Sequence, residues 1–154
     1  MRTFFTLLLL AVSLLLMKSC TKVDPVTKIV QDQLKEEILK RAESNLNEQP
    51  ITVTAFRSER SAGGSHDFYS EGDYWWPDSL NPEGPYVQRD GQTNPDNFVA
   101  HRHAMIRFST LVGNLTSAYL LTKDRKYIDA ALVHVRAWFI NEETRMNPSL
   151  LYAQ

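Results

Sequence analysis

The residues best suited to chemistry lie in one aromatic stretch, residues 71–95, with the sequence EGDYWWPDSLNPEGPYVQRDGQTNP. It holds Trp75 and Trp76, two of the three tryptophans of the chain, but shows neither a helical nor a strand period. Side chains of adjacent residues on an extended backbone point to opposite sides. An indole offers a flat apolar face together with one N–H donor, which suits the C–H face of a sugar ring. The pair predicts a sugar-binding wall or, alternatively, two anchors that pack the loop over helices.

Three polar residues near this stretch are further candidates. Arg89 is able to hold a carboxylate through two parallel hydrogen bonds. The alternative for Arg89 is a surface contact with Asp90 or Glu83, which contributes little to stability. His101 falls on the apolar face of its predicted helix, with Arg102 at the edge of that face. A histidine there is either a hydrogen-bonded core residue or a group that faces a cleft, and both interpretations are open.

Several familiar kinds of site are missing from the sequence. It has no HExxH motif, cysteine pair, acidic calcium loop, glycine-rich phosphate loop or nucleophile elbow. No metal or cofactor is therefore expected. The formal net charge of -1 gives no basic field, so nucleic acid is not an expected partner. His66 has no local partner in the sequence, and His134 is predicted to face solvent from the polar side of its helix.

Residues 1–19 have the features of a signal peptide. Arg2 precedes residues 4–17, a run of 14 residues that is apolar apart from Thr6 and Ser13. The run is too short to span a bilayer, which takes about 20 apolar residues. It matches the apolar segment of an export signal, so the protein is expected to be exported.

Cys20, the only cysteine, follows Ser19 directly at the end of the apolar run. A small residue followed by Cys is typical of a bacterial lipoprotein processing site, although Lys18 is an unusual neighbour. Cleavage before Cys20 would leave a lipidated amino terminus and a tether, residues 20–25, that anchors the protein to a membrane. The expected location is the periplasm or the outer membrane. Ordinary secretion with an incidental cysteine is the alternative. One cysteine makes no disulfide within the chain.

Hydrophobic spacing predicts an all-α chain in which a long loop separates a first helix from a helical hairpin. Asn94 and Pro95 have the residue types of a helix cap and first helical position. Asp124 is the predicted cap of the last helix. The predicted elements are a helix over residues 26–46, a short extended piece over 51–56, a loop over 58–93, a helix from 94 to about 121, a turn over 122–124 and a helix ending near 141.

The hairpin cannot bury both of its faces alone, and such units occur in bundles, solenoids and toroids. Three helices and a long loop make a thin core for the residues that follow the signal peptide. Residues 26–154 are therefore expected to be the amino-terminal portion of a larger, truncated domain.

Several segments together resemble the alginate lyase family of polysaccharide lyases, in particular its exported members from Bacteroidetes-type bacteria. They are GDYWWPD, GPYVQRDG, the NP that leads into HRHAM, DRKYIDAALVHVRAWF and MNPSLLYAQ, which run in this order from about residue 69 to 154. The resemblance implies part of an α/α toroid with a polysaccharide groove. It also implies cleavage of an acidic polysaccharide, alginate or a related polyuronate, by β-elimination, without a metal or cofactor.

The resemblance carries over groove residues but not catalytic ones. It places Trp75, Trp76, Tyr86, Arg89, His101 and Arg102 near the groove, and Asn147, Tyr152 and Gln154 in the segment that leads into it. The Asn-His pair of the family, with its Tyr and Arg, has no match here and is expected beyond Gln154. This chain alone is therefore expected to be inactive.

Two other functions remain open. One is a noncatalytic glycan-binding lipoprotein that uses the same aromatic stretch. The other is a glycoside hydrolase on a similar toroid, which requires a pair of carboxylates. Asp73, Asp78 and Asp90 are available for such a pair, although each sits in a turn-like setting where Asp is common.

Overall fold

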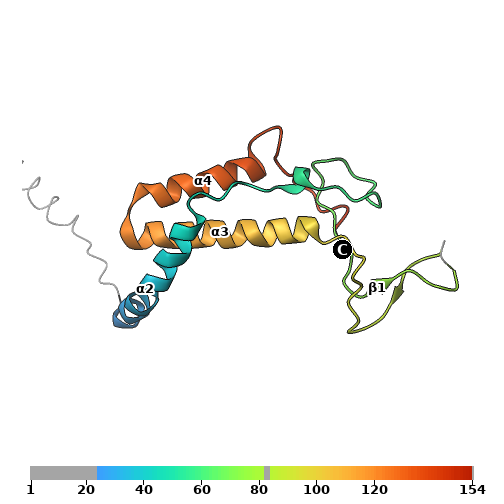
Figure 1. The fold of residues 1–154 in the computed structure, drawn as a ribbon, viewed down its shortest axis with the longest axis horizontal. Coiled ribbons are helices and arrows are strands. Elements are labelled where there is room, and N and C mark those ends of the chain that lie inside the picture. The colour runs from blue at the N-terminus through green and yellow to red at the C-terminus, as the bar shows by residue number, and fades with distance from the viewer. Residues whose placement is uncertain (1–23, 82–83, 154) are drawn as a thin grey trace, which may run out of the picture. The chain divides into compact units, whose positions relative to one another are not determined.

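The computed structural model describes residues 24–81 and 84–153 and is mostly helical (Figure 1). The predicted signal peptide, the predicted lipidation site at Cys20 and the predicted groove residue Gln154 lie outside the described residues. None of the described helices is long and apolar enough to cross a membrane. In order, the elements are α2 (Pro25–Asn45), the 3-10 helix η1 (Val53–Ala55), β1 (Trp75–Trp76), β2 (Val87–Gln88), α3 (Ala100–Thr122) and α4 (Arg125–Phe139).

The chain divides into two compact units, residues 1–34 and residues 35–154. The described part of the first unit is the start of α2. Asp24 precedes this helix and its carboxylate accepts a hydrogen bond of 2.9 Å from the Thr27 amide, so Asp24 caps the helix and Pro25 takes its first position. Val26, Ile29 and Leu34 are exposed there.

Helices α3 and α4 form the antiparallel hairpin that the sequence predicts, and they lie side by side in Figure 1. Lys123 ends α3 in the left-handed region, at φ 61°, and donates its amide to the Tyr119 carbonyl at 2.7 Å. Asp124 caps α4 by accepting from the Lys126 amide at 3.1 Å. The predicted turn and the predicted cap of α4 are both confirmed.

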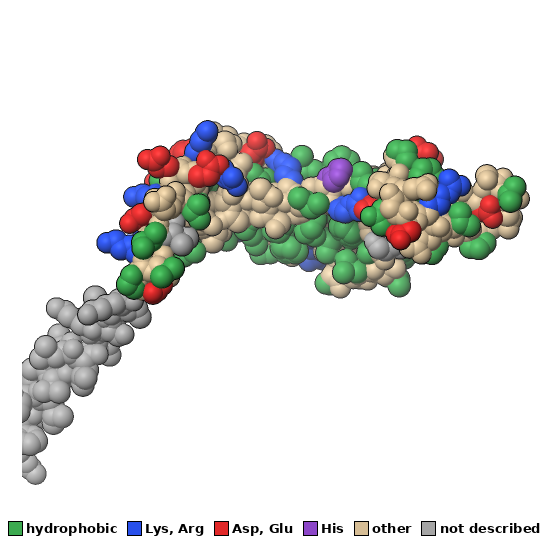
Figure 2. Space-filling model, turned by 90° about the horizontal axis from the view of Figure 1, so that it is seen from below, with side chains coloured by type: hydrophobic (Ala, Val, Ile, Leu, Met, Phe, Trp, Pro, Cys, Tyr) green, Lys and Arg blue, Asp and Glu red, His purple; other side chains and the backbone are tan. Residues whose placement is uncertain are grey.

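Two buried clusters hold the second unit together. The first joins Ala42 of α2 to Leu115 and Ala118 of α3 and to Tyr127 and Ala131 of α4. The second joins Val53 of η1, Ala104 of α3 and Trp138 of α4. Apolar side chains also stand exposed along the helices, and Figure 2 shows hydrophobic side chains gathered there. Those on the hairpin are Ile106, Leu120, Leu132, Val133 and Phe139.

Helix α3 begins later than predicted. The structure starts it at Ala100, after Val99, whose side chain makes no capping hydrogen bond. Asn94 instead forms a tight turn, in which its side-chain oxygen accepts from the Asp96 amide at 3.0 Å. Asn is as well suited to such turns as to helix caps, so the Asn-Pro pair marks the turn and not the helix start. The piece over residues 51–56, predicted to be extended, also contains η1.

His134 is buried, and its predicted exposure to solvent is wrong. It is 2% exposed and shares the inner face of α4 with Tyr127, Ala131 and Trp138. These residues follow each other at spacings of four, three and four, the period of one helix face. Burial lowers the pKa of His134, and the nearby positive charge of Arg107 lowers it further.

We expect His134 to make the protein less stable in mild acid. As pH falls below the ordinary value of 6.5, the unfolded chain takes up a proton that the folded chain refuses. The free energy of unfolding should therefore decrease between pH 6.5 and the lower pKa of the folded state. Urea unfolding across this range should show a shallower decrease for His134→Gln. His103→Gln, a change at an exposed histidine of α3, should leave the slope unchanged. Equal slopes for all three proteins would contradict this role.

Candidate functional site

The aromatic stretch folds as a short antiparallel hairpin. Trp75 pairs with Gln88 and Trp76 with Val87, and the Arg89 amide donates to the Tyr74 carbonyl at 2.8 Å. The two indoles have different surroundings, as expected for adjacent residues on a strand. Trp75 is 40% exposed and lines a pocket. Trp76 donates its indole N–H to the Gln92 carbonyl at 2.8 Å, and the Arg89 guanidinium lies 4.9 Å from the centre of its ring.

Two asparagine residues just before α3 form hydrogen bonds to this hairpin. The buried Asn94 donates from its side chain to the Trp75 carbonyl at 3.0 Å and from its backbone to the Asp73 carbonyl at 2.8 Å. The buried Asn97 donates from its side chain to the Gly72 carbonyl at 2.7 Å. The two asparagine side chains therefore add to the pairing of the strands, which have only two residues each.

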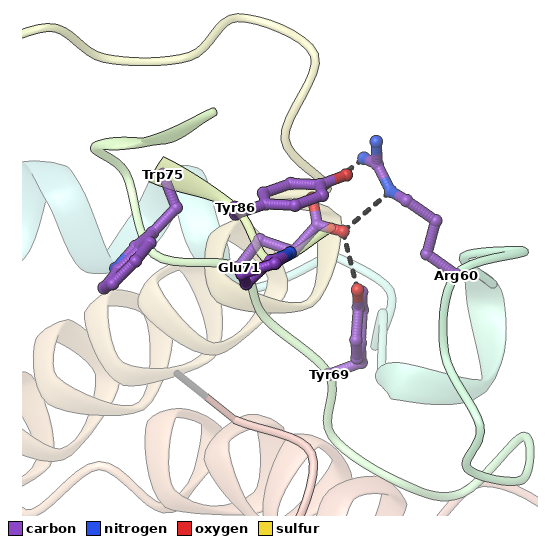
Figure 3. A pocket seen from close by; sticks show the side chains of 6 residues that line it. Arg60, Tyr69, Glu71, Trp75 and Tyr86 are labelled. Atoms are coloured by element: carbon purple, nitrogen blue, oxygen red, sulfur yellow. Dashed lines mark hydrogen bonds and ion pairs between the residues drawn. The ribbon is translucent and has the colours of Figure 1, made fainter. Parts of the chain in front are cut away.

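A pocket of about 780 Å³ opens beside the hairpin (Figure 3). Aromatic side chains supply much of its wall, and one arginine and one glutamate also line it. In Figure 3, Trp75 stands at the end of the pocket opposite Arg60, with Glu71 between them. The lining residues are Arg60, Tyr69, Glu71, Trp75, Pro85 and Tyr86.

The Glu71 carboxylate is the centre of the polar contacts in this pocket. Glu71 is 8% exposed. One of its oxygens accepts from Arg60 Nε at 2.7 Å and from the Tyr69 hydroxyl at 2.6 Å. The other accepts from Arg60 Nη2 at 2.8 Å and from the Phe98 amide at 2.8 Å. Four donors occupy the roughly four acceptor positions of a carboxylate, so Glu71 is paired throughout.

Tyr69 is held in its protonated form. Burial, followed by the hydrogen bond to the negatively charged Glu71, raises the pKa of Tyr69 to about 12. The Tyr69 hydroxyl is therefore a hydrogen-bond donor near neutral pH. A ligand group that accepted this hydrogen bond would have to take the place of Glu71 as the acceptor. The Tyr69 ring is consequently a fixed wall of the pocket, and its oxygen is unsuited to act as a general base.

His101 connects two loop segments to α3. Its Nδ1 accepts from the Tyr69 amide at 3.0 Å, which requires the proton of a neutral ring to sit on Nε2. Nε2 lies 3.1 Å from the Phe56 carbonyl and donates to it. The ring is 3% exposed and packs edge-on against Phe98, with a centroid distance of 4.8 Å.

A family model described as alginate lyase matches residues 52–154, which is more than half of the chain. This chain belongs to the alginate lyase family. The resemblance that the sequence indicates is thereby confirmed.

A crystal structure of an alginate lyase from Bacteroides ovatus is similar to this chain, with 30% sequence identity and a TM-score of 0.66. The match covers 81% of this chain and 35% of the lyase, so the chain spans about a third of that protein. No curated protein matches the chain. The expected fold class, an all-α chain that forms part of an α/α toroid, is confirmed to the extent that the chain is mostly helical and similar to part of an alginate lyase. The predicted long loop differs in containing the two short strands β1 and β2.

The structure brings together two of the groove residues predicted from the alginate lyase resemblance, Trp75 and Tyr86, which line the pocket. Trp76 and Arg89 lie together beside it, and the alternative contact of Arg89 with Glu83 falls outside the described residues. Arg102 pairs with Asp73 at 2.6 Å. That ion pair, at the base of the hairpin, favours a positioning role for Arg102.

Three other residues predicted from the alginate lyase resemblance, His101, Asn147 and Tyr152, make contacts within the fold. His101 is buried with both nitrogens in use, which favours the core interpretation over contact with a polymer. Asn147 donates to the Asp67 carboxylate at 2.8 Å, and this bond is the main reason why the pKa of Asp67 is lowered. Tyr152 bridges to Tyr69 and packs so closely on Gly63 that a Cβ there would lie 2.8 Å from the Tyr152 ring.

The sequence did not indicate four of the six residues that line the pocket: Arg60, Tyr69, Glu71 and Pro85. Arg60 and Glu71 are 11 positions apart in segments without any hydrophobic period, so no local pattern indicates their pairing. His66 likewise finds a distant partner, because its Nδ1 lies 2.7 Å from the Arg145 carbonyl. Across residues 24–81 and 84–153, no three His, Cys, Asp or Glu side chains are grouped to hold a metal ion.

Proposed function

We propose that the protein is a polysaccharide lyase for an acidic polymer such as alginate or a related polyuronate, and that the pocket lined by Arg60, Tyr69, Glu71, Trp75, Pro85 and Tyr86 binds sugar. The observation that carries this proposal is a pocket walled by Trp75, Tyr69 and Tyr86 within a domain of the alginate lyase family. Flat aromatic faces suit the C–H faces of sugar rings, and the arginine of the pocket suits the charge of a uronate.

β-Elimination explains what such a site has to do. Neutralising the charge of the C5 carboxylate makes the C5 proton acidic, and a base removes that proton. The electron pair left on C5 forms a double bond to C4, the bond from C4 to the bridging oxygen breaks, and that oxygen takes up a proton. One product therefore carries a new C=C bond, and the other carries a new hydroxyl.

The described residues of the pocket support binding and orientation more than proton transfer. Tyr69 is a protonated donor, Glu71 is saturated with donors, and both nitrogens of His101 are engaged. None of these three has a free basic atom at neutral pH. Trp75 and Tyr86 offer ring faces, so the contribution of this chain is to hold the polymer.

The proposal is tested by mixing the purified chain with alginate and with polyglucuronate. We expect calorimetry to detect binding, and we expect no rise in the absorbance of the unsaturated product. Dextran, a neutral polymer, serves as the control ligand. The absence of binding to both acidic polymers would refute the sugar-binding assignment. A steady rise in absorbance would show that residues of this chain also carry out the elimination.

A further inference from the structure

We infer that Arg60 determines specificity for an acidic sugar by contacting its carboxylate, and that Glu71 is the residue that positions Arg60. This inference rests on the proposed function of the same pocket. Neither residue is among the groove residues predicted from the sequence, and both are recognised from the contacts that they make in the folded chain.

The guanidinium of Arg60 is only partly used by the protein. Nε and Nη2 form a two-pronged pair with Glu71, and Nη2 also donates to the Asp96 carbonyl at 2.6 Å. Arginine has five N–H donors, two of which are on Nη1. Among the described residues, none accepts a hydrogen bond from Nη1, and the side chain remains 43% exposed. Arg60 therefore lines the pocket with two donors available to a ligand.

Glu71 acts through Arg60, because its carboxylate has no acceptor position left for a hydrogen bond from a sugar. Its two oxygens already accept four hydrogen bonds, and it is nearly inaccessible. The bonds from Tyr69 and from the Phe98 amide fix the carboxylate to the pocket wall and to the segment that precedes α3. A carboxylate fixed in this way sets the plane of the guanidinium, so Nη1 is presented in one orientation.

The pairing also determines what Arg60 recognises. Glu71 balances the charge of Arg60, so attraction at a distance is weak and recognition depends on short, directed hydrogen bonds. A hydrogen bond from the Nη1 of a guanidinium is shorter and stronger to a charged carboxylate oxygen than to a neutral hydroxyl. Arg60 lines the pocket, whereas Arg89 lies over Trp76 and Arg102 binds Asp73. Arg60 is therefore the best placed of the three to bind the carboxylate of a uronate.

The test compares two ligands that differ only at C6: alginate oligosaccharides and the same oligosaccharides with their charged carboxyl groups reduced to neutral alcohols. Calorimetry on the full chain measures both affinities. Arg60→Gln should weaken binding of the acidic ligand about tenfold or more, the usual effect of losing a hydrogen bond to a charged group, and should leave binding of the reduced ligand nearly unchanged. Arg125→Gln removes an equal charge from an exposed position of α4 and should change neither affinity.

Glu71→Gln tests the positioning role. It keeps the size of the side chain and one acceptor oxygen but loses the two-pronged pair, so it should weaken binding of the acidic ligand selectively. The double variant should bind the acidic ligand no more weakly than Arg60→Gln alone, because both changes remove the same contact. Circular dichroism checks folding. If Glu71→Gln does not fold, Arg60→Gln still decides the matter, because the Arg60 side chain is partly exposed.

The outcomes separate this inference from the proposed function. If the unmodified chain binds alginate and Arg60→Gln binds it equally well, the inference is refuted and the pocket assignment stands. Equal losses for the acidic and the reduced ligand would make Arg60 a structural residue and would also refute it. If the unmodified chain binds neither ligand, the proposed function and the inference both fail.

Discussion

Replacing Trp138 by alanine should lower the free energy of unfolding by about 3–5 kcal/mol, as is usual when a large aromatic residue is removed from a core. Trp138 is fully buried and packs with Val53 and Ala104. Its ring lies 5.2 Å from that of Phe108, measured between centroids. The loss should appear in urea unfolding as a lower midpoint with little change in slope.

The neighbouring residue provides a matched control for this change. Phe139 also contacts Phe108, with a ring distance of 5.4 Å, but it is 49% exposed. Phe139→Ala should therefore cost about 1 kcal/mol, in the range of ordinary single substitutions. If Trp138→Ala lost no more free energy of unfolding than Phe139→Ala, the second buried cluster would not be part of the core that holds the second unit together.

Trp75→Ala should weaken binding of alginate oligosaccharides about tenfold or more, while the free energy of unfolding changes by about 1 kcal/mol or less. Trp75 is 40% exposed and provides one wall of the pocket, so its removal takes away a ring face without opening a buried cavity. Calorimetry and urea unfolding on the same preparations measure the two effects separately.

Trp76→Ala is the comparison for this prediction. From the sequence, both tryptophans are expected to contact the polymer, but the structure distinguishes them. The Trp76 indole donates a hydrogen bond to the Gln92 carbonyl and lies under the Arg89 guanidinium. Compared with Trp75→Ala, Trp76→Ala should therefore destabilise the β1–β2 hairpin more and lower the affinity for the oligosaccharide less. Equal loss of affinity for the two variants would mean that both rings touch the sugar. A stability loss above about 3 kcal/mol for Trp75→Ala, with unchanged binding, would make Trp75 a core residue.

The helical hairpin could be predicted from the sequence because its signals are local. The apolar stripes of α3 and α4 repeat at three and four residues, and Asp124 stands where a cap is needed. His134 was predictable by the same rule, since its spacing from Ala131 and Trp138 puts it on the buried face. Its position in the helix period, and not its polarity, determines its burial.

The pocket was only partly predictable, because its polar contacts join residues that are far apart in the sequence. Trp75 and Tyr86 stand out by composition alone. Glu71, by contrast, is recognisable only when the fold brings Arg60 and the Phe98 amide to it. The start of α3 could not be predicted from the sequence for the same reason, because the Asn94 side chain donates a hydrogen bond to the Trp75 carbonyl, 19 positions away.

The hydrogen bonds from Asn94 and Asn97 to the β1–β2 hairpin have a consequence for the thermodynamics of binding. Asn94 and Asn97 are buried and tie the segment from Gly72 to Trp75 to the residues that precede α3. The conformational entropy of this loop is therefore lost when the chain folds, and little of it is left to lose when a polymer arrives. A preorganised wall of this kind favours tight binding from few contacts, because most of the contact energy remains as affinity.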